Sequence, residues 1–199
     1  MKTLRSTPLS AAIALLVFGS GLGPVSAQAA GTSAYPPFAS NAAATRGASH
    51  FVRIPADGVR SLSRLELSPR FTADYGSFRW MELSDSDYWR MAALGSLAAE
   101  EKEAGQIQIN RFRFDPVADG VPPTGARLDS EGVGPGFHLV QFRGPVKAEW
   151  LSELETAGLE PLQYYPSNTY LVWGEPGSLA RTENLPFVRW QGRVQPAYK

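Results

Sequence analysis

The feature that most constrains the fold is a stretch rich in glycine and proline near the middle of the chain. Residues 116–136, PVADGVPPTGARLDSEGVGPG, contain five Gly and four Pro among 21 positions and show no apolar periodicity. This composition favours turns and irregular backbone, so the stretch is predicted to be a linker. It separates two segments of similar size, residues 51–115 and 137–199, each about as long as a small domain.

The segment 137–199 alternates between strand and helix patterns. FHLVQF (137–142) is typical of a strand, apolar residues then recur at helical spacing from Val146 to Leu154, and Gly158 supplies a stop. The remaining predicted elements are two strands joined across Pro166-Ser167-Asn168, a short helix in GSLARTENL (177–185) and a closing strand in FVRWQGR (187–193). The predicted order is β-α-β-β-α-β.

The segment 51–115 follows the same plan less clearly. Ser84, with Asp87 three positions later, forms a helix-capping pattern, which we favour over a calcium site because no glycine-turned loop with a later Glu follows. The predicted elements are a strand in SHFVRI (49–54), a helix in DGVRSLSRL (57–65), a hairpin within RFTADYGSFRWMEL (70–83), the capped helix and a closing strand in QIQINRFRF (106–114). The predicted fold class is therefore α+β: two ferredoxin-like β-α-β-β-α-β modules, each an antiparallel four-stranded sheet with two helices.

The first 50 residues predict export. Residues 1–29 have the layout of a secretory signal peptide, with two cations, an apolar run and small residues at its end. The run is shorter than the roughly 20 apolar residues that a membrane-spanning helix needs. Residues 30–50 are rich in Ala, Ser and Gly and are predicted to be a disordered leader. The protein is expected to be secreted or periplasmic, without a stable membrane anchor after cleavage.

The composition excludes several kinds of site. The chain has no cysteine, which excludes disulfides and cysteine-ligated metals, and 19 cations balance 19 anions, which leaves no net field to attract nucleic acid. Arg and Phe alternate in NRFRFDP (110–116) as in RNA-binding sheets, but the neutral charge favours a half-buried strand. Two histidines, His50 and His138, are too few for a zinc site or a hydrolytic triad, so no metal, cofactor or catalytic residue is predicted. His138 is interpreted as an edge or partner-facing strand residue.

The second module carries more apolar surface than two helices can cover. In FHLVQF (137–142) and TYLVWG (169–174), apolar side chains occupy both alternating sets of positions, so both faces of the sheet are apolar. Two helices cover only one face of a four-stranded sheet, and the other face is therefore expected to dock onto the sister module, a copy of this chain or a separate protein. The residues predicted for this docking face are Val140, Phe142, Leu171 and Trp173.

Taken together, the motifs of the second module resemble a known family. They are Gly144-Pro145-Val146 after the first strand, Trp150-Leu151 in the helix, Tyr165-Pro166-Ser167-Asn168 with Tyr170-Leu171-Val172, and Val188-Arg189-Trp190 leading to Pro196-Ala197-Tyr198-Lys199. With these motifs, residues 137–199 are similar to the propeptide, of the propeptide-type inhibitor fold, that precedes the catalytic domain in secreted bacterial subtilisin-like serine proteases. The first module resembles that region only in position and layout.

This resemblance implies a folding chaperone and inhibitor of a subtilisin-like serine protease, acting in cis or in trans. It implies that the sheet packs on the protease and that an extended C-terminal tail lies along the substrate cleft, as in strand addition. The tail residues that match are Gln195, Pro196, Ala197, Tyr198 and Lys199.

The sequence departs from the family in one respect. No Asp, His or Ser motif of the subtilisin-like catalytic domain is present, so this chain is not expected to be an enzyme. Two alternatives stay open. One is an exported protein-protein interaction module unrelated to proteolysis, and the other is the N-terminal part of a subtilisin-like protease precursor.

Overall fold

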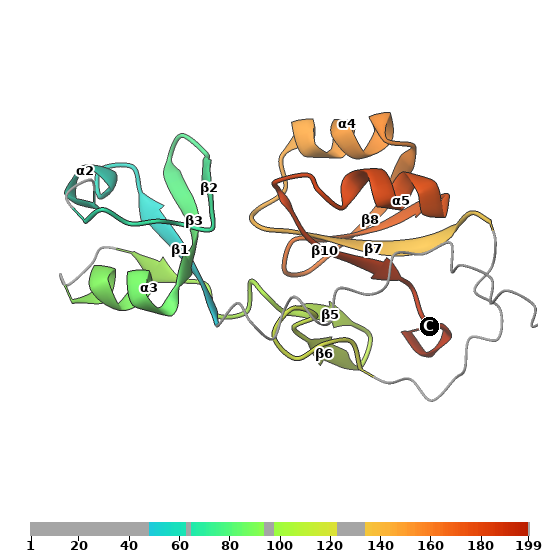
Figure 1. Cartoon of the computed structure of the whole chain (residues 1–199), viewed down its shortest axis with the longest axis horizontal. Helices are drawn as coiled ribbons and strands as arrows, with labels where there is room; N and C mark the ends of the chain where they lie inside the picture. Colours follow the sequence, from blue (N-terminus) through green and yellow to red (C-terminus); the bar gives the residue numbers. More distant parts are fainter. Residues whose placement is uncertain (1–47, 63–64, 94–97, 123–133, 199) are drawn as a thin grey trace, which may run out of the picture. The chain divides into compact units, whose positions relative to one another are not determined.

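The computed structural model describes residues 48–62, 65–93, 98–122 and 134–198. The predicted signal peptide, most of the predicted leader and the middle of the predicted linker lie outside these residues. The described part is α+β, with helices packed on antiparallel sheets, as predicted (Figure 1). Among its helices, none has the length and apolar character needed to cross a bilayer.

The first module, residues 49–100, is a four-stranded antiparallel sheet with its helices on one face. Its elements are β1 (Ser49–Pro55), α2 (Val59–Leu62), β2 (Phe71–Asp74), β3 (Phe78–Ser84), α3 (Asp85–Ala92) and β4 (Ala99–Glu100). The strand order across the sheet is β2-β3-β1-β4. Because β1 begins at Ser49, the last two residues of the predicted leader belong to the sheet. Val52, Ile54, Leu83 and Met91 form the core under the helices.

The second module, residues 136–193, has the β-α-β-β-α-β order that its sequence predicts. Its elements are β7 (Gly136–Phe142), α4 (Ala148–Thr156), β8 (Leu159–Tyr165), β9 (Thr169–Gly174), α5 (Pro176–Thr182) and β10 (Val188–Arg193). The sheet is antiparallel with strand order β10-β7-β9-β8, and α4 and α5 lie on one face of it (Figure 1).

Both modules share one topology. Counted from the start of each module, the strands are arranged fourth, first, third, second in both sheets. Each first strand is therefore central and is flanked by strands that come much later in its module.

One strand prediction is wrong. The segment 106–114, expected to close the first sheet, is a separate hairpin of β5 (Ile107–Ile109) and β6 (Phe112–Phe114), and the short β4 closes the first sheet instead. Asn110 lies at the hairpin turn with φ of 49°, a left-handed conformation that asparagine tolerates better than most residues. The alternation of Arg and Phe nevertheless marks a half-buried strand, as predicted, because Phe114 of β6 is buried and Arg113 is exposed.

Local signals set the ends of two helices. The Ser84 hydroxyl accepts a hydrogen bond from the Asp87 backbone amide at 3.3 Å, which confirms the predicted cap of α3. After α4 the chain passes Gly158 with φ of 85°, where an added Cβ would lie 2.8 Å from Ser178 Oγ. A glycine is needed there for both reasons.

The main core lies between the second sheet and its helices. Trp150 of α4 stacks on Phe187 at 5.2 Å and on Phe142 at 5.9 Å between ring centroids. Phe71, from β2 of the first module, reaches the same core and meets Trp150 edge-on at 5.9 Å. The two modules therefore share apolar contacts as well as a common topology.

Candidate functional site

The face of the second sheet opposite its helices is covered by the β5–β6 hairpin (Figure 1). The side chains of this contact are Ile107, Ile109, Phe112 and Phe114 of the hairpin with Leu139, Leu171, Trp190 and Tyr198 of the second module. The second apolar face that the sequence predicts is therefore covered, and the cover comes from the same chain.

The four residues predicted for one docking face lie on two faces, which corrects that assignment. Val140 and Phe142 are fully buried in the core under the helices. Leu171 instead pairs with Leu139 on the hairpin side, and Trp173, two residues along the same strand, points to that side as well. The prediction put the wrong residues of β7 on this face. Apolar side chains of β7 point to both faces of the sheet, and the sequence does not show which of them share a face with Leu171.

The tail is not extended, contrary to the expectation from the resemblance. Pro196–Tyr198 form a 3-10 helix, and Tyr198 is only 2% exposed, between the hairpin and the sheet. The Asn110 side chain at the hairpin turn donates a hydrogen bond to the Tyr198 carbonyl. Burial raises the pKa of the Tyr198 phenol to about 12. Lys199 lies outside the described residues.

A buried arginine clamps the base of the hairpin to the second sheet. The Arg189 guanidinium donates to both carboxylate oxygens of Asp115 at 2.9 Å, to the Gly105 carbonyl at 3.0 Å and to Gln141 Oε1 at 2.8 Å. Gln141 also donates to the Gly105 carbonyl at 3.0 Å. A Cβ on Gly105 would lie 2.5 Å from Asp115 Oδ2, so only glycine fits within this network. We refer to Gly105, Asp115, Gln141 and Arg189 as the arginine clamp.

A second polar group joins the two modules. The Arg143 guanidinium donates to the buried carboxylate of Glu82 at 2.6 Å. The backbone carbonyl of Arg143 accepts a hydrogen bond from the Trp80 indole at 2.8 Å. A Cβ on the neighbouring Gly144 would lie 2.9 Å from the Trp80 ring. The Gly-Pro break predicted after the first strand of the second module is therefore a contact point with the first module.

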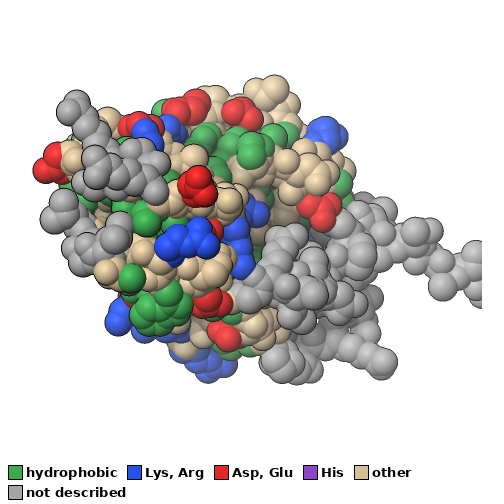
Figure 2. All heavy atoms as spheres, turned by 60° about the vertical axis from the view of Figure 1, so that its left-hand side comes forward, with side chains coloured by type: hydrophobic (Ala, Val, Ile, Leu, Met, Phe, Trp, Pro, Cys, Tyr) green, Lys and Arg blue, Asp and Glu red, His purple; other side chains and the backbone are tan. Residues whose placement is uncertain are grey.

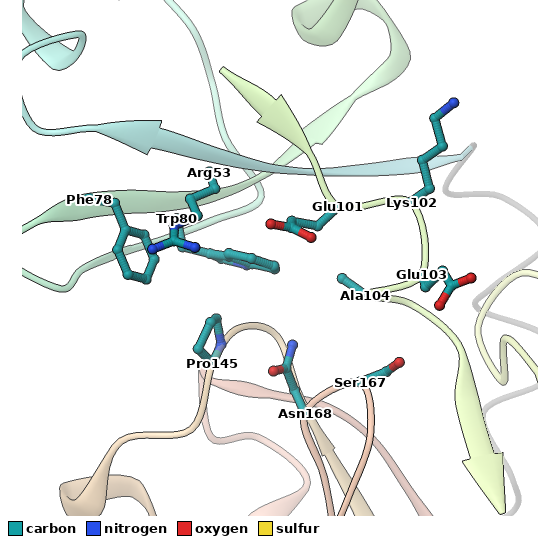
Figure 3. A pocket seen from close by; sticks show the side chains of 10 residues that line it. All are labelled: Arg53, Phe78, Trp80, Glu101, Lys102, Glu103, Ala104, Pro145, Ser167 and Asn168. Carbon is teal, nitrogen blue, oxygen red and sulfur yellow. The ribbon is translucent and has the colours of Figure 1, made fainter. Parts of the chain in front are cut away.

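Next to this junction lies a pocket of about 450 Å³ (Figure 3). It is lined by Arg53 and the rings of Phe78 and Trp80 from the first sheet, by residues 101–104 after β4, and by Pro145, Ser167 and Asn168 of the second module. The volume is within the range of sites for small ligands or single side chains. Sequence reasoning missed this pocket because its residues come from five separate parts of the chain.

His50 is held between two carboxylates of the first module. Its Nδ1 lies 2.8 Å from Glu100 Oε1 and its Nε2 lies 2.9 Å from Asp85 Oδ1, while its ring stacks on Tyr88 at 4.0 Å. Burial lowers its pKa, but the hydrogen bonds to Glu100 and Asp85 outweigh burial and raise the pKa above the ordinary value of 6.5. The arrangement therefore suits the imidazolium form, in which both ring nitrogens donate.

His138 differs from its predicted place at an edge or partner-facing position. It lies in β7, a central strand, and it is fully buried. Burial, with a smaller contribution from the nearby Arg193, lowers its pKa to about 4, against the opposing effect of a hydrogen bond to the Gly174 backbone. His138 is therefore a neutral side chain inside the sheet, and another protein cannot reach it. Within the described ranges, no three His, Asp or Glu side chains are grouped so that they could hold a metal ion.

The visible surface carries charges of both signs. Figure 2 shows one face on which acidic and basic side chains are interspersed with apolar ones, and neither sign forms a continuous patch. This pattern agrees with the balanced charge of the whole chain, with 19 residues of each sign.

Residues 108–195 match a protein family described as a domain of unknown function (DUF8729). The matched stretch begins inside β5 and ends just after β10, so it groups the hairpin with the second module, as the packing does. No curated protein matches this chain, and no solved structure matches it.

Proposed function

We propose that this protein is an exported, non-catalytic inhibitor and folding chaperone of a subtilisin-like serine protease, with the second module in the role of a propeptide. We further propose that both modules are ferredoxin-like. The observation that carries the proposal is the β-α-β-β-α-β order of residues 136–193 with strand order β10-β7-β9-β8. That arrangement suits the propeptide-type inhibitor fold, and the motifs that resemble the family lie in the breaks after β7 and β8, in α4, and in strands β9 and β10.

Binding in a substrate cleft would require the tail to leave its present position. Burial of a side chain as large as Tyr198 contributes roughly 1.5–3 kcal/mol, and its hydrogen bond with Asn110 roughly 1 kcal/mol. A micromolar complex is stabilised by about 8 kcal/mol. Main-chain hydrogen bonds to the edge of a protease cleft can therefore offset the release of residues 195–199.

Refolding of a denatured protease tests the chaperone role. Subtilisin-like proteases denatured without their own propeptides are diluted into buffer with or without the purified chain, and the recovery of peptidase activity is followed over time after removal or digestion of the chain. We expect a higher yield or a faster recovery for at least one such protease. An unchanged yield and rate for every protease tested would count against the proposal.

One observation favours a second candidate, an interaction module unrelated to proteolysis. The sheet face that would pack on a protease already carries the β5–β6 hairpin. Among the large apolar residues, Leu162 and Tyr164 are exposed on β8, a strand at the edge of the sheet. An open edge can pair with a strand of a partner. A folded chain without effect on protease activity or refolding would support this candidate.

A further inference from the structure

The pocket beside Trp80 contains polar groups that the fold itself does not use (Figure 3). Asn168 is only 8% exposed, and its backbone is engaged: its carbonyl accepts from the Phe142 amide at 2.8 Å and its amide donates to the Tyr164 hydroxyl at 3.4 Å. Among the described residues its carboxamide makes no side-chain hydrogen bond, and it lines the pocket, where a ligand can reach its polar atoms (Figure 3). A carboxamide held in place by its backbone and open to the pocket can donate to and accept from a ligand without first breaking a hydrogen bond within the protein.

The charges around the pocket leave one carboxylate for a ligand. Glu103 forms an ion pair with Arg113 at 2.8 Å, and Lys102 extends away from the pocket (Figure 3). Glu101 is partly buried, and within the described part of the chain it forms neither an ion pair nor a side-chain hydrogen bond. Its carboxylate is directed toward the side of the pocket that carries Trp80 (Figure 3). A carboxylate and an aromatic ring that line one pocket are a suitable environment for an organic cation.

The opposite end of the pocket carries a positive charge. The Arg53 guanidinium lies over the Phe78 ring at 4.1 Å and reaches the pocket from β1. It can donate to a carbonyl oxygen, whereas the Asn168 carboxamide can both donate and accept. A main-chain amide offers one donor and one acceptor, so the pocket combines partners for a peptide backbone with a partner for a cation.

We propose that this pocket binds a lysine or arginine side chain of an extended peptide. The cationic group lies between Glu101 and the Trp80 ring, and the flanking main-chain amides pair with Asn168 and Arg53. The proposal is independent of any protease, because its residues are distinct from the tail and from the hairpin contact.

The test is a titration of the full chain with short blocked peptides. The probes are acetyl-Ala-Lys-Ala-amide, its arginine analogue, and matched peptides with norleucine or glutamate at the centre. Binding is measured by calorimetry and by the NMR shifts of the Trp80 indole NH and the Asn168 side-chain amide. We expect the two basic peptides to bind and to move both signals, with affinity that falls as salt is added.

Two variants and one control locate the site. Glu101→Gln keeps the shape of the side chain and should weaken binding of the basic peptides by about tenfold or more, because it removes a charge-assisted hydrogen bond. Asn168→Gly removes the carboxamide while tolerating the local φ of 58°, and it should weaken them as well. Lys102→Gln, on a side chain that extends away, should leave binding unchanged.

The proposal is overturned if the norleucine peptide binds as tightly as the lysine peptide, if Glu101→Gln has no effect, or if neither NMR signal moves at millimolar peptide. Preferential binding of the glutamate peptide would assign the pocket to Arg53 and an anionic ligand, and would also overturn it.

Discussion

His50 connects three elements of the first module, because its ring nitrogens face Glu100 of β4 and Asp85 of α3 from β1. The pKa of His50 is raised, so its charged form stabilises the fold fully below the ordinary pKa of 6.5, and this contribution is lost as the pH rises through the higher pKa of the folded state. The pKa of Glu100 is lowered, chiefly by the hydrogen bond from His50. Its carboxylate therefore stabilises the fold above the ordinary pKa of 4.5, and this stabilisation is lost as the pH falls through the lower pKa of the folded state. The two contributions coincide between these limits.

We therefore expect the stability difference between the native chain and His50→Gln to be largest from about pH 4.5 to 6.5 and to shrink at higher pH. The neighbouring charged or titratable groups are Asp85, Tyr88, Glu100 and Lys102. Asp85 is half exposed, so the difference should be about 1 kcal/mol or less. Urea unfolding from pH 4.5 to 8.5 measures it, and a difference that is constant across this range contradicts the assignment.

Arg189 provides a second prediction, on the arginine clamp. Its side chain is 2% exposed and its charge is compensated mainly by Asp115. Arg189→Met leaves that carboxylate without its partner and should lower the free energy of unfolding by roughly 3–5 kcal/mol. The matched control is Arg79→Met, because Arg79 pairs with Asp74 at 3.2 Å at the surface and should contribute less than about 1 kcal/mol. If urea unfolding shows that both substitutions lower the free energy of unfolding equally, the arginine clamp stabilises the fold no more than a surface ion pair does.

The residues of the clamp illustrate the limit of prediction at this scale. Helix caps and turn residues such as Ser84 and Asn168 could be found from the sequence, because their partners lie within a few positions. Arg189 and Asp115 are separated by 74 positions, and the sequence alone does not indicate that they meet. The pocket beside Trp80 was missed for the same reason.

At the scale of elements, strands and helices were predicted correctly where apolar residues recur with a single strand or helix period. The prediction failed where a turn interrupts an alternating segment without a glycine or proline to mark it. The strands and helices of the second module match the sequence pattern closely. QIQINRFRF alternates throughout its length and reads as one strand, but Asn110 divides it into two. Its central position between Ile-Gln-Ile and Phe-Arg-Phe is the signal that could have indicated a hairpin.

The contact between the hairpin and the tail gives a third prediction. Tyr198→Ala removes a ring that packs against Phe112 and Phe114, and it should lower the free energy of unfolding by roughly 3 kcal/mol. Tyr164→Ala is the control, because Tyr164 is 50% exposed on the edge strand and its loss should cost about 0.5–1 kcal/mol. Urea unfolding monitored by tryptophan fluorescence, with Trp190 beside Tyr198, compares the two. A Tyr198 variant as stable as the native chain would mean that the tail is already detached in solution.

At the scale of the whole molecule, two copies of one topology are joined by apolar and polar contacts. Phe71 enters the core of the second module, and Glu82 of the first module binds Arg143 of the second. The sequence predicted two α+β modules and the need to cover a second apolar face, because both follow from period and composition. It did not predict that the segment after the first module provides the cover, because that depends on long-range packing.

The central claim is that this chain inhibits subtilisin-like serine proteases, and the most direct test is inhibition of purified enzymes. The hydrolysis of a chromogenic peptide by a panel of subtilisin-like proteases is measured with increasing amounts of the full chain, with trypsin as a control of unrelated fold. We expect competitive inhibition of at least one member of the panel, with an inhibition constant of about 1 µM or tighter, and no inhibition of trypsin. A folded chain that inhibits no member of the panel at about 50 µM, or that inhibits trypsin equally well, would contradict the claim.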